Sequence, residues 1–136
     1  MTEYSVDSGL KYVMNVKHRN GTKGAGQWSI NETEEVQCFE LAIHNHWLVA
    51  RNGWTLHLPD GSKADWLGVA DDHVTRAFIA KLVTNSTRDV WHGYPIVNDR
   101  NEHSPPREVV RDWLAQEFVS ARVATKLVRG RPCLVL

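Results

Sequence analysis

Six tryptophans in a chain of 136 residues constrain the fold more than any other feature of this sequence. Large aromatic side chains gather in cores, interfaces and ligand pockets, and a small domain needs their area to bury enough apolar surface. We therefore expect most of them in a core. The length suits one domain over residues 1–136, and 42% apolar with 24% charged residues is typical of a globular protein rather than a disordered chain.

Neither a membrane anchor nor a secretion signal is predicted. No apolar run approaches the ~20 residues of a membrane-spanning helix, and the first residues, MTEYSVDSGLKY, lack the basic and apolar regions of a signal peptide. The two cysteines, Cys38 and Cys133, lie in apolar surroundings without CxxC spacing, which predicts buried free thiols. We therefore expect a cytoplasmic protein.

The N-terminal half predicts strands on either side of one helix. Residues 4–17 alternate between apolar and polar, as in a strand, with a turn at residues 7–9, and the glycine-rich residues 18–27 predict a flexible loop. A capping residue and first-turn acids at Asn31 predict a helix to about Ala50, although alternation in its second half also fits a strand. A short strand should follow over residues 54–58, before a turn.

The C-terminal half predicts three helices. One should run from Asp71 or Asp72 to about Asn85, since its apolar residues recur at helical spacing, and a structured loop should follow over residues 88–101. A pair of helices is then expected over residues 104–117 and 120–130, because Ser120 can cap the second and Gly130 can end it. The fold class is therefore α+β, a small, mostly antiparallel sheet covered by about four helices.

The second helix of this pair is the first candidate site. Residues 118–136 contain no acid, and Arg122, Lys126 and Arg129 follow one another at spacings of four and three. This spacing places the cations on one exposed helix face, as in a recognition helix that contacts phosphates. The alternative is that they only complement the helix dipole and keep the surface hydrated. The candidate binding residues are Arg122, Thr125, Lys126, Arg129 and Arg131.

The expected loop at residues 88–101 is the second candidate site. A histidine stands between two aromatic residues there, with charged residues on both sides. Histidine can act as a general acid or base near neutral pH, arginines can hold a phosphate, and aromatic rings can stack on a substrate. The alternative is a structural loop whose aromatic side chains are buried. The candidate residues are Arg88, Trp91, His92, Tyr94 and Arg100, with Asp89 and Asp99 as neighbouring acids.

No metal or cofactor site is predicted. On a helix, His44 and His46 would point about 200 degrees apart, so they could share a metal ion only if they lay on a strand. Gly21, Gly24 and Gly26 follow neither the phosphate-loop nor the dinucleotide-binding order. We therefore expect neither a bound metal nor a cofactor.

Three functional hypotheses follow. The leading one is a small intracellular binding or regulatory protein that presents residues 118–131 to a protein partner or to nucleic acid, and the balanced charge of 16 basic and 16 acidic residues slightly favours a protein. The alternative is a small hydrolase or nuclease-like enzyme with His92 as general acid or base. The third hypothesis, a subunit of a larger assembly or oligomer, rests on the number of tryptophans.

Overall fold

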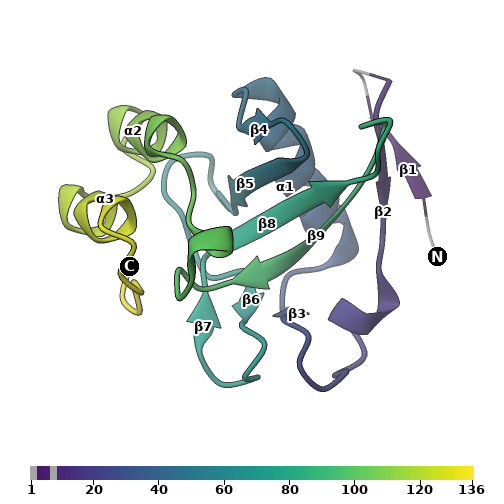
Figure 1. Cartoon of the computed structure of the whole chain (residues 1–136), viewed down its shortest axis with the longest axis horizontal. Helices are drawn as coiled ribbons and strands as arrows, with labels where there is room; N and C mark the ends of the chain where they lie inside the picture. The colour runs from purple at the N-terminus through teal and green to yellow at the C-terminus, as the bar shows by residue number, and fades with distance from the viewer. Residues whose placement is uncertain (1–2, 7–8) are drawn as a thin grey trace.

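A six-stranded mixed sheet forms the centre of the computed structural model, which describes residues 3–6 and 9–136 (Figure 1). All neighbouring strands run antiparallel except β2 and β9, which are parallel. The α+β class is confirmed, although the sheet is larger than expected. In spatial order the strands are β1 (Glu3–Ser5), β2 (Lys11–Val13), β9 (Val90–Ile96), β8 (Ile79–Thr84), β5 (Asn52–Leu56) and β4 (Leu48–Val49).

The N-terminal residues form a pair of short strands rather than one long strand. Tyr4 of β1 lies opposite Tyr12 of β2. The expected turn includes Asp7 and Ser8, which lie outside the described residues. After β2 the chain enters a short 3-10 helix, η1 (Val16–His18), whose first turn is capped because the Asn15 side chain accepts the Lys17 backbone N–H. The chain thereby leaves the sheet and turns across its open face.

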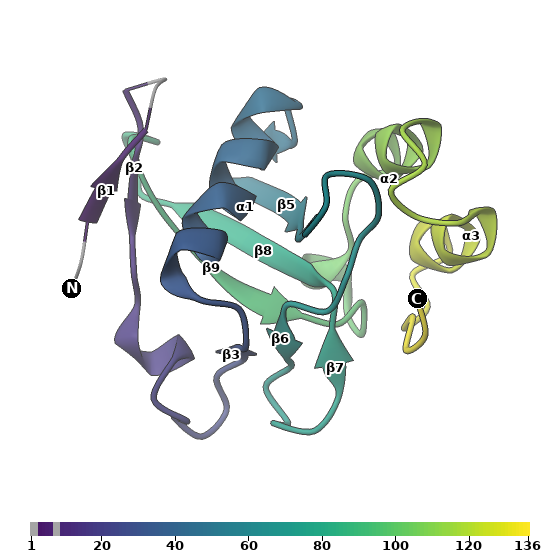
Figure 2. The same cartoon turned by 180° about the vertical axis from the view of Figure 1, so that it is seen from behind.

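Helix α1 (Glu32–His44) covers the other face of the sheet (Figure 2). Its predicted start is confirmed: the Asn31 side chain accepts the Glu34 N–H, and the Glu34 carboxylate accepts the Asn31 N–H in return. The helix ends at His44, and the chain then forms β4, so a strand does occur in the second half of the segment. Phe39 of α1 packs its ring against Tyr12, at 5.1 Å between centroids.

The helix expected over residues 71–85 does not form. The Asp72 side chain accepts the N–H groups of Val74 and Thr75 and so closes a turn, and Val74, expected on the buried face, is 79% exposed. The chain then forms β7 (Arg76–Ala77) and β8. Because β8 lies between β5 and β9 and is covered on both faces along most of its length, its apolar residues do not alternate, and such a run can imitate the spacing of a helix.

The loop expected over residues 88–101 contains strand β9 instead. Alternate side chains of a strand point to opposite faces. Trp91 therefore packs under α1, whereas His92 and Tyr94 face the open side of the sheet. Pro95 is accommodated because β9 has already run past β2, which pairs with β9 only at residues 90 and 91.

The predicted C-terminal helix pair is confirmed as α2 (Arg107–Ala115) and α3 (Ala121–Val128), beside the sheet in Figure 1. The Ser120 side chain accepts the Val123 N–H, and Gly130 has the positive φ of 68° that favours glycine after a helix end. With α1, these are the three α-helices of the described residues, one fewer than expected. Trp113 of α2 is fully buried and meets Trp47 edge to face at 5.7 Å.

A second, three-stranded sheet fixes the loop that precedes α1. It consists of β3 (Gln27–Trp28), β6 (Gly68–Val69) and β7. A Cβ atom added at Gly26 would lie 2.4 Å from the carbonyl oxygen of Pro95, so only glycine lets this loop approach β9 so closely. The glycine-rich loop therefore ends held against the main sheet.

The core contains most of the large aromatic side chains, as the sequence predicts. Five tryptophans are buried, and Trp66 is half-buried beneath the guanidinium of Arg76. Cys38 and Cys133 are buried free thiols, which confirms that prediction. Within residues 3–6 and 9–136, every helix is too short or too polar to cross a bilayer.

Candidate functional site

A polar pocket of about 320 Å³ opens on the face of the sheet opposite α1. Its floor is the outward face of β9. One wall is formed by η1 and the glycine-rich loop, and the other by the residues that follow β9, including the short 3-10 helix η2 (Asn101–His103). The charged, histidine and tyrosine side chains that line it are Lys17, His18, Asp71, His92, Tyr94, Asp99, Arg100, Glu102 and His103.

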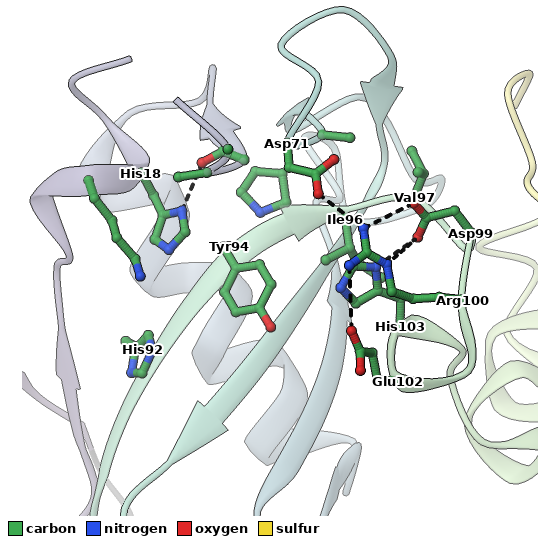
Figure 3. Close-up of a pocket in the computed structure, with 16 residues that line it drawn as sticks. His18, Asp71, His92, Tyr94, Ile96, Val97, Asp99, Arg100, Glu102 and His103 are labelled. Atoms are coloured by element: carbon green, nitrogen blue, oxygen red, sulfur yellow. Dashed lines mark hydrogen bonds and ion pairs between the residues drawn. The ribbon is translucent and has the colours of Figure 1, made fainter. Parts of the chain in front are cut away.

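Tyr94 lies at the middle of this pocket, between two histidines (Figure 3). The ring of His18 stacks on that of Tyr94 at 5.1 Å between centroids and an interplanar angle of 16°. His103 meets the same ring edge to face, at 6.4 Å and 68°. His92, two residues before Tyr94 on β9, lines the same pocket because it shares the outward face of the strand.

His18 is held in one orientation and stays neutral near pH 7. Its Nδ1 lies 2.8 Å from the carbonyl oxygen of Gly26, so this nitrogen must donate, and Nε2 keeps its lone pair. Burial lowers the pKa of His18, and the positive charge of Lys17 lowers it further, against the Gly26 hydrogen bond. Burial and Lys17 also lower the pKa of His92. The lowered pKa values favour the uncharged form of both imidazoles at neutral pH.

Asp99 orients the third histidine. The Nδ1 of His103 lies 2.9 Å from Oδ1 of Asp99, which leaves Nε2 of His103 free to accept a proton. Burial alone would raise the pKa of Asp99, but hydrogen bonds from His103 and Arg100 outweigh it and lower that pKa. Asp99 is thus a carboxylate at neutral pH and can stabilise positive charge that develops on the imidazole.

Arg100 is fully occupied by acids. Its guanidinium contacts three carboxylates, at 3.0 Å from Asp71, 3.4 Å from Asp99 and 3.5 Å from Glu102. A substrate phosphate would have to compete with all three. The arginine therefore ties the segment after β9 to Asp71, and it is not a free anion-binding group.

Two buried residues, Tyr12 and Glu35, and the half-buried Arg19 hold the strand before η1 and the residue after it in place. The Glu35 carboxylate, on α1, accepts the Tyr12 hydroxyl at 2.5 Å and a guanidinium N–H of Arg19 at 2.8 Å. Burial raises the pKa of Glu35, and the hydrogen bonds from Tyr12 and Arg19 oppose that rise. Because Arg19 follows His18 directly in the chain, this anchor fixes where His18 can lie.

The second candidate site from the sequence is therefore only partly assembled in this pocket. His92, Tyr94, Asp99 and Arg100 do line it. The other members lie elsewhere: Trp91 is buried beneath α1, while Arg88 and Asp89 belong to the β8–β9 turn and do not line it.

His18, Lys17 and His103 line the same pocket, although the sequence does not single them out. A local signal could have found His103: it follows Asp99 by four residues, a spacing at which an acid and a histidine can pair. His18 and Lys17 carry none, because they reach the pocket through the parallel pairing of β2 with β9.

The first candidate site lies on the helix pair, away from the pocket. Thr125 and Arg129 line a second cavity between α2 and α3, together with Arg107 and Arg111. Arg122 and Lys126, also on α3, are not among the residues that line this cavity, and Arg131 follows the helix. The cationic residues of α3 are thus accompanied by two further arginines on α2.

The histidine pair of α1 and its C-terminal end is not part of a cluster. His44 is the last residue of α1, and His46 follows it with a positive φ of 60°; both side chains are exposed. Across residues 3–6 and 9–136, no group of three or more histidine, cysteine, aspartate or glutamate residues is arranged to hold a metal ion.

Comparison of the chain with protein-family models, with curated proteins and with solved structures finds no match.

Proposed function

We propose that the pocket over β9 is the active site of an enzyme that cleaves phosphate diesters by general acid–base catalysis. The observation that supports this most is the convergence of His18 and His103 on opposite sides of Tyr94, each with one ring nitrogen hydrogen-bonded and the other free. This is the arrangement that proton transfer at a bound substrate requires.

His103 is the proposed base. Its Nε2 takes a proton from the attacking hydroxyl or water, while Asp99 stabilises the resulting imidazolium. The leaving oxygen departs on the opposite side of the phosphorus and takes its proton from a water molecule that hydrogen-bonds to Nε2 of His18, and the His103 imidazolium then returns its proton to solvent. The residues that line the pocket include no serine, threonine or cysteine, so we assign the nucleophile to the substrate or to water. His92, the base expected from the sequence, instead takes a binding role beside Lys17.

The charge of the pocket favours a diester over a monoester. Two cations, Lys17 and Arg100, stand against the three carboxylates of Asp71, Asp99 and Glu102, which leaves an excess of one negative charge. A dianionic monoester would be repelled. The single negative charge of a diester can lie at the Lys17 end, where Lys17 already lowers the pKa of both His18 and His92.

The test is hydrolysis of a fluorogenic RNA oligonucleotide and of bis(p-nitrophenyl) phosphate by the purified chain. We expect His103→Ala to lower kcat/KM by about 100-fold or more, and Asp99→Asn to lower it less, since the general base makes the larger contribution. His44→Ala is the matched control because its imidazole is exposed and outside the pocket, and it should retain full activity.

Two results would contradict this proposal. The first is a wild-type chain that cleaves neither substrate. The second is a His103→Ala preparation as active as the wild type after identical purification, which would assign the cleavage to a contaminating nuclease.

A further inference from the structure

The cavity between α2 and α3 has an apolar floor and a cationic rim. Its volume is about 340 Å³. The floor is formed by Val110 and Leu114 from α2 and by Ala124 and Val128 from α3, four residues apart in each helix. Leu114 and Val128 remain 39% and 41% exposed, although the same helices bury their other large apolar side chains. We call this surface the α2–α3 groove.

The arginines at its rim contact no acidic side chain among the residues that the structure describes. Arg107 and Arg111 line one side and Arg129 lines the other. None of the three forms an ion pair with a residue in the described part of the chain, in contrast with Arg100, which has three carboxylates, and Arg19, which has Glu35. Arginine beside exposed apolar residues is the composition that protein interfaces favour.

We propose that the α2–α3 groove binds an acidic amphipathic helix of a partner protein. The apolar stripe of such a helix would cover Leu114 and Val128, and its flanking carboxylates would pair with Arg107, Arg111 and Arg129. Phosphate contacts of a nucleic acid would need the arginines but would leave the apolar floor uncovered. The floor therefore favours a protein over a nucleic acid.

Occupation of the groove would leave the pocket over β9 open. The helix pair lies beside the sheet (Figure 1). The pocket lies on the open face of the sheet, and the two sets of lining residues do not overlap. The bound partner would therefore tether the chain rather than block the pocket. The inference is independent of the proposed enzymatic activity, because it rests on other residues and is tested by binding alone.

The probe is a fluorescein-labelled helical peptide of about 14 residues, roughly 21 Å long, with leucines on one face and glutamates beside them. Anisotropy should show binding that weakens as salt is raised, and Arg111→Glu should weaken it at least about tenfold. Lys23→Glu is the matched control, since it reverses one exposed charge that lies outside both cavities. A peptide with lysines in place of the glutamates should not bind.

Methyl NMR locates the contact without a charge change. Addition of the acidic peptide should shift the methyl signals of Val110, Leu114 and Val128. Val128→Asn should also weaken binding of the peptide, and it serves as the test if Arg111→Glu does not fold. Equal affinity for acidic and basic peptides would overturn the proposal. Binding of duplex DNA through these arginines, without binding of the peptide, would also overturn it. So would a dimer in sedimentation that Val128→Asn dissociates, because a second copy of the chain would then fill the groove.

Discussion

At the scale of single residues, Glu35 is the buried group that most needs a compensating partner. Its carboxylate is only 2% exposed, and Arg19 supplies the cation that offsets the loss of water. Arg19→Met should lower the free energy of unfolding by about 3 kcal/mol, because it leaves a buried carboxylate without its partner. Urea denaturation measures this change.

A double variant separates the ion pair from the loss of packing. Arg19→Met combined with Glu35→Gln removes the uncompensated charge and should recover part of the lost stability. If Arg19→Met alone leaves the urea midpoint unchanged, Glu35 does not depend on Arg19 for its charge. His18 would then need another anchor.

Single-residue reasoning identifies four of the nine charged, histidine and tyrosine side chains that line the pocket. A histidine next to aromatic and charged residues is visible in the sequence, which is why His92 and Tyr94 are found. The same reasoning includes Trp91, which the strand directs to the opposite face. It misses His18, because nothing in the neighbouring residues of that histidine indicates which strand they will join.

At the scale of elements, signals local to the sequence predict better than periodicity. The caps at Asn31 and Ser120 form as expected because each cap needs only side chains within three residues. Strand β9 alternates in burial but is missed because Gly93 and Pro95 occupy inward positions where a strand usually carries a large apolar side chain. Strand β8 is missed for a different reason. A central strand buried on both faces loses the alternation by which strands are recognised.

Helix α2 is attached to the segment after α1 through two tryptophans with different polar environments. The indole N–H of Trp47 donates to the Asp112 carboxylate at 2.7 Å, whereas the buried indole N–H of Trp113 has no partner within the described residues. Trp47→Phe should therefore destabilise the chain by about 1 kcal/mol more than Trp113→Phe, since only the first loses a hydrogen bond to a charged group. Thermal unfolding of both variants gives the comparison, and the reverse order would show that ring packing outweighs the hydrogen bond.

At the scale of the whole molecule, the pocket makes stability depend on pH. Burial lowers the pKa of His18 and of His92, so the folded chain holds fewer protons than the unfolded chain just below about pH 6.5. Unfolding then takes up protons, and the free energy of unfolding falls as the pH falls through this window. His92→Gln should lose less stability than the wild type between about pH 7.5 and pH 5.5, and urea midpoints at both values measure the difference. Equal losses would show that His92 titrates alike in both states.

The parallel pairing of β2 with β9 sets the order in which this chain can complete itself. Lys11 and Tyr12 can pair with Val90 and Trp91 only after the ribosome has synthesised these later residues. Arg19 can pair with Glu35 of α1 before that point, but the segment that carries His18 meets the floor of the pocket only when the β8–β9 hairpin has emerged. A nascent or truncated chain that stops before β9 would hold one wall of the pocket and lack its floor, so any activity of this site would belong to the finished polypeptide alone.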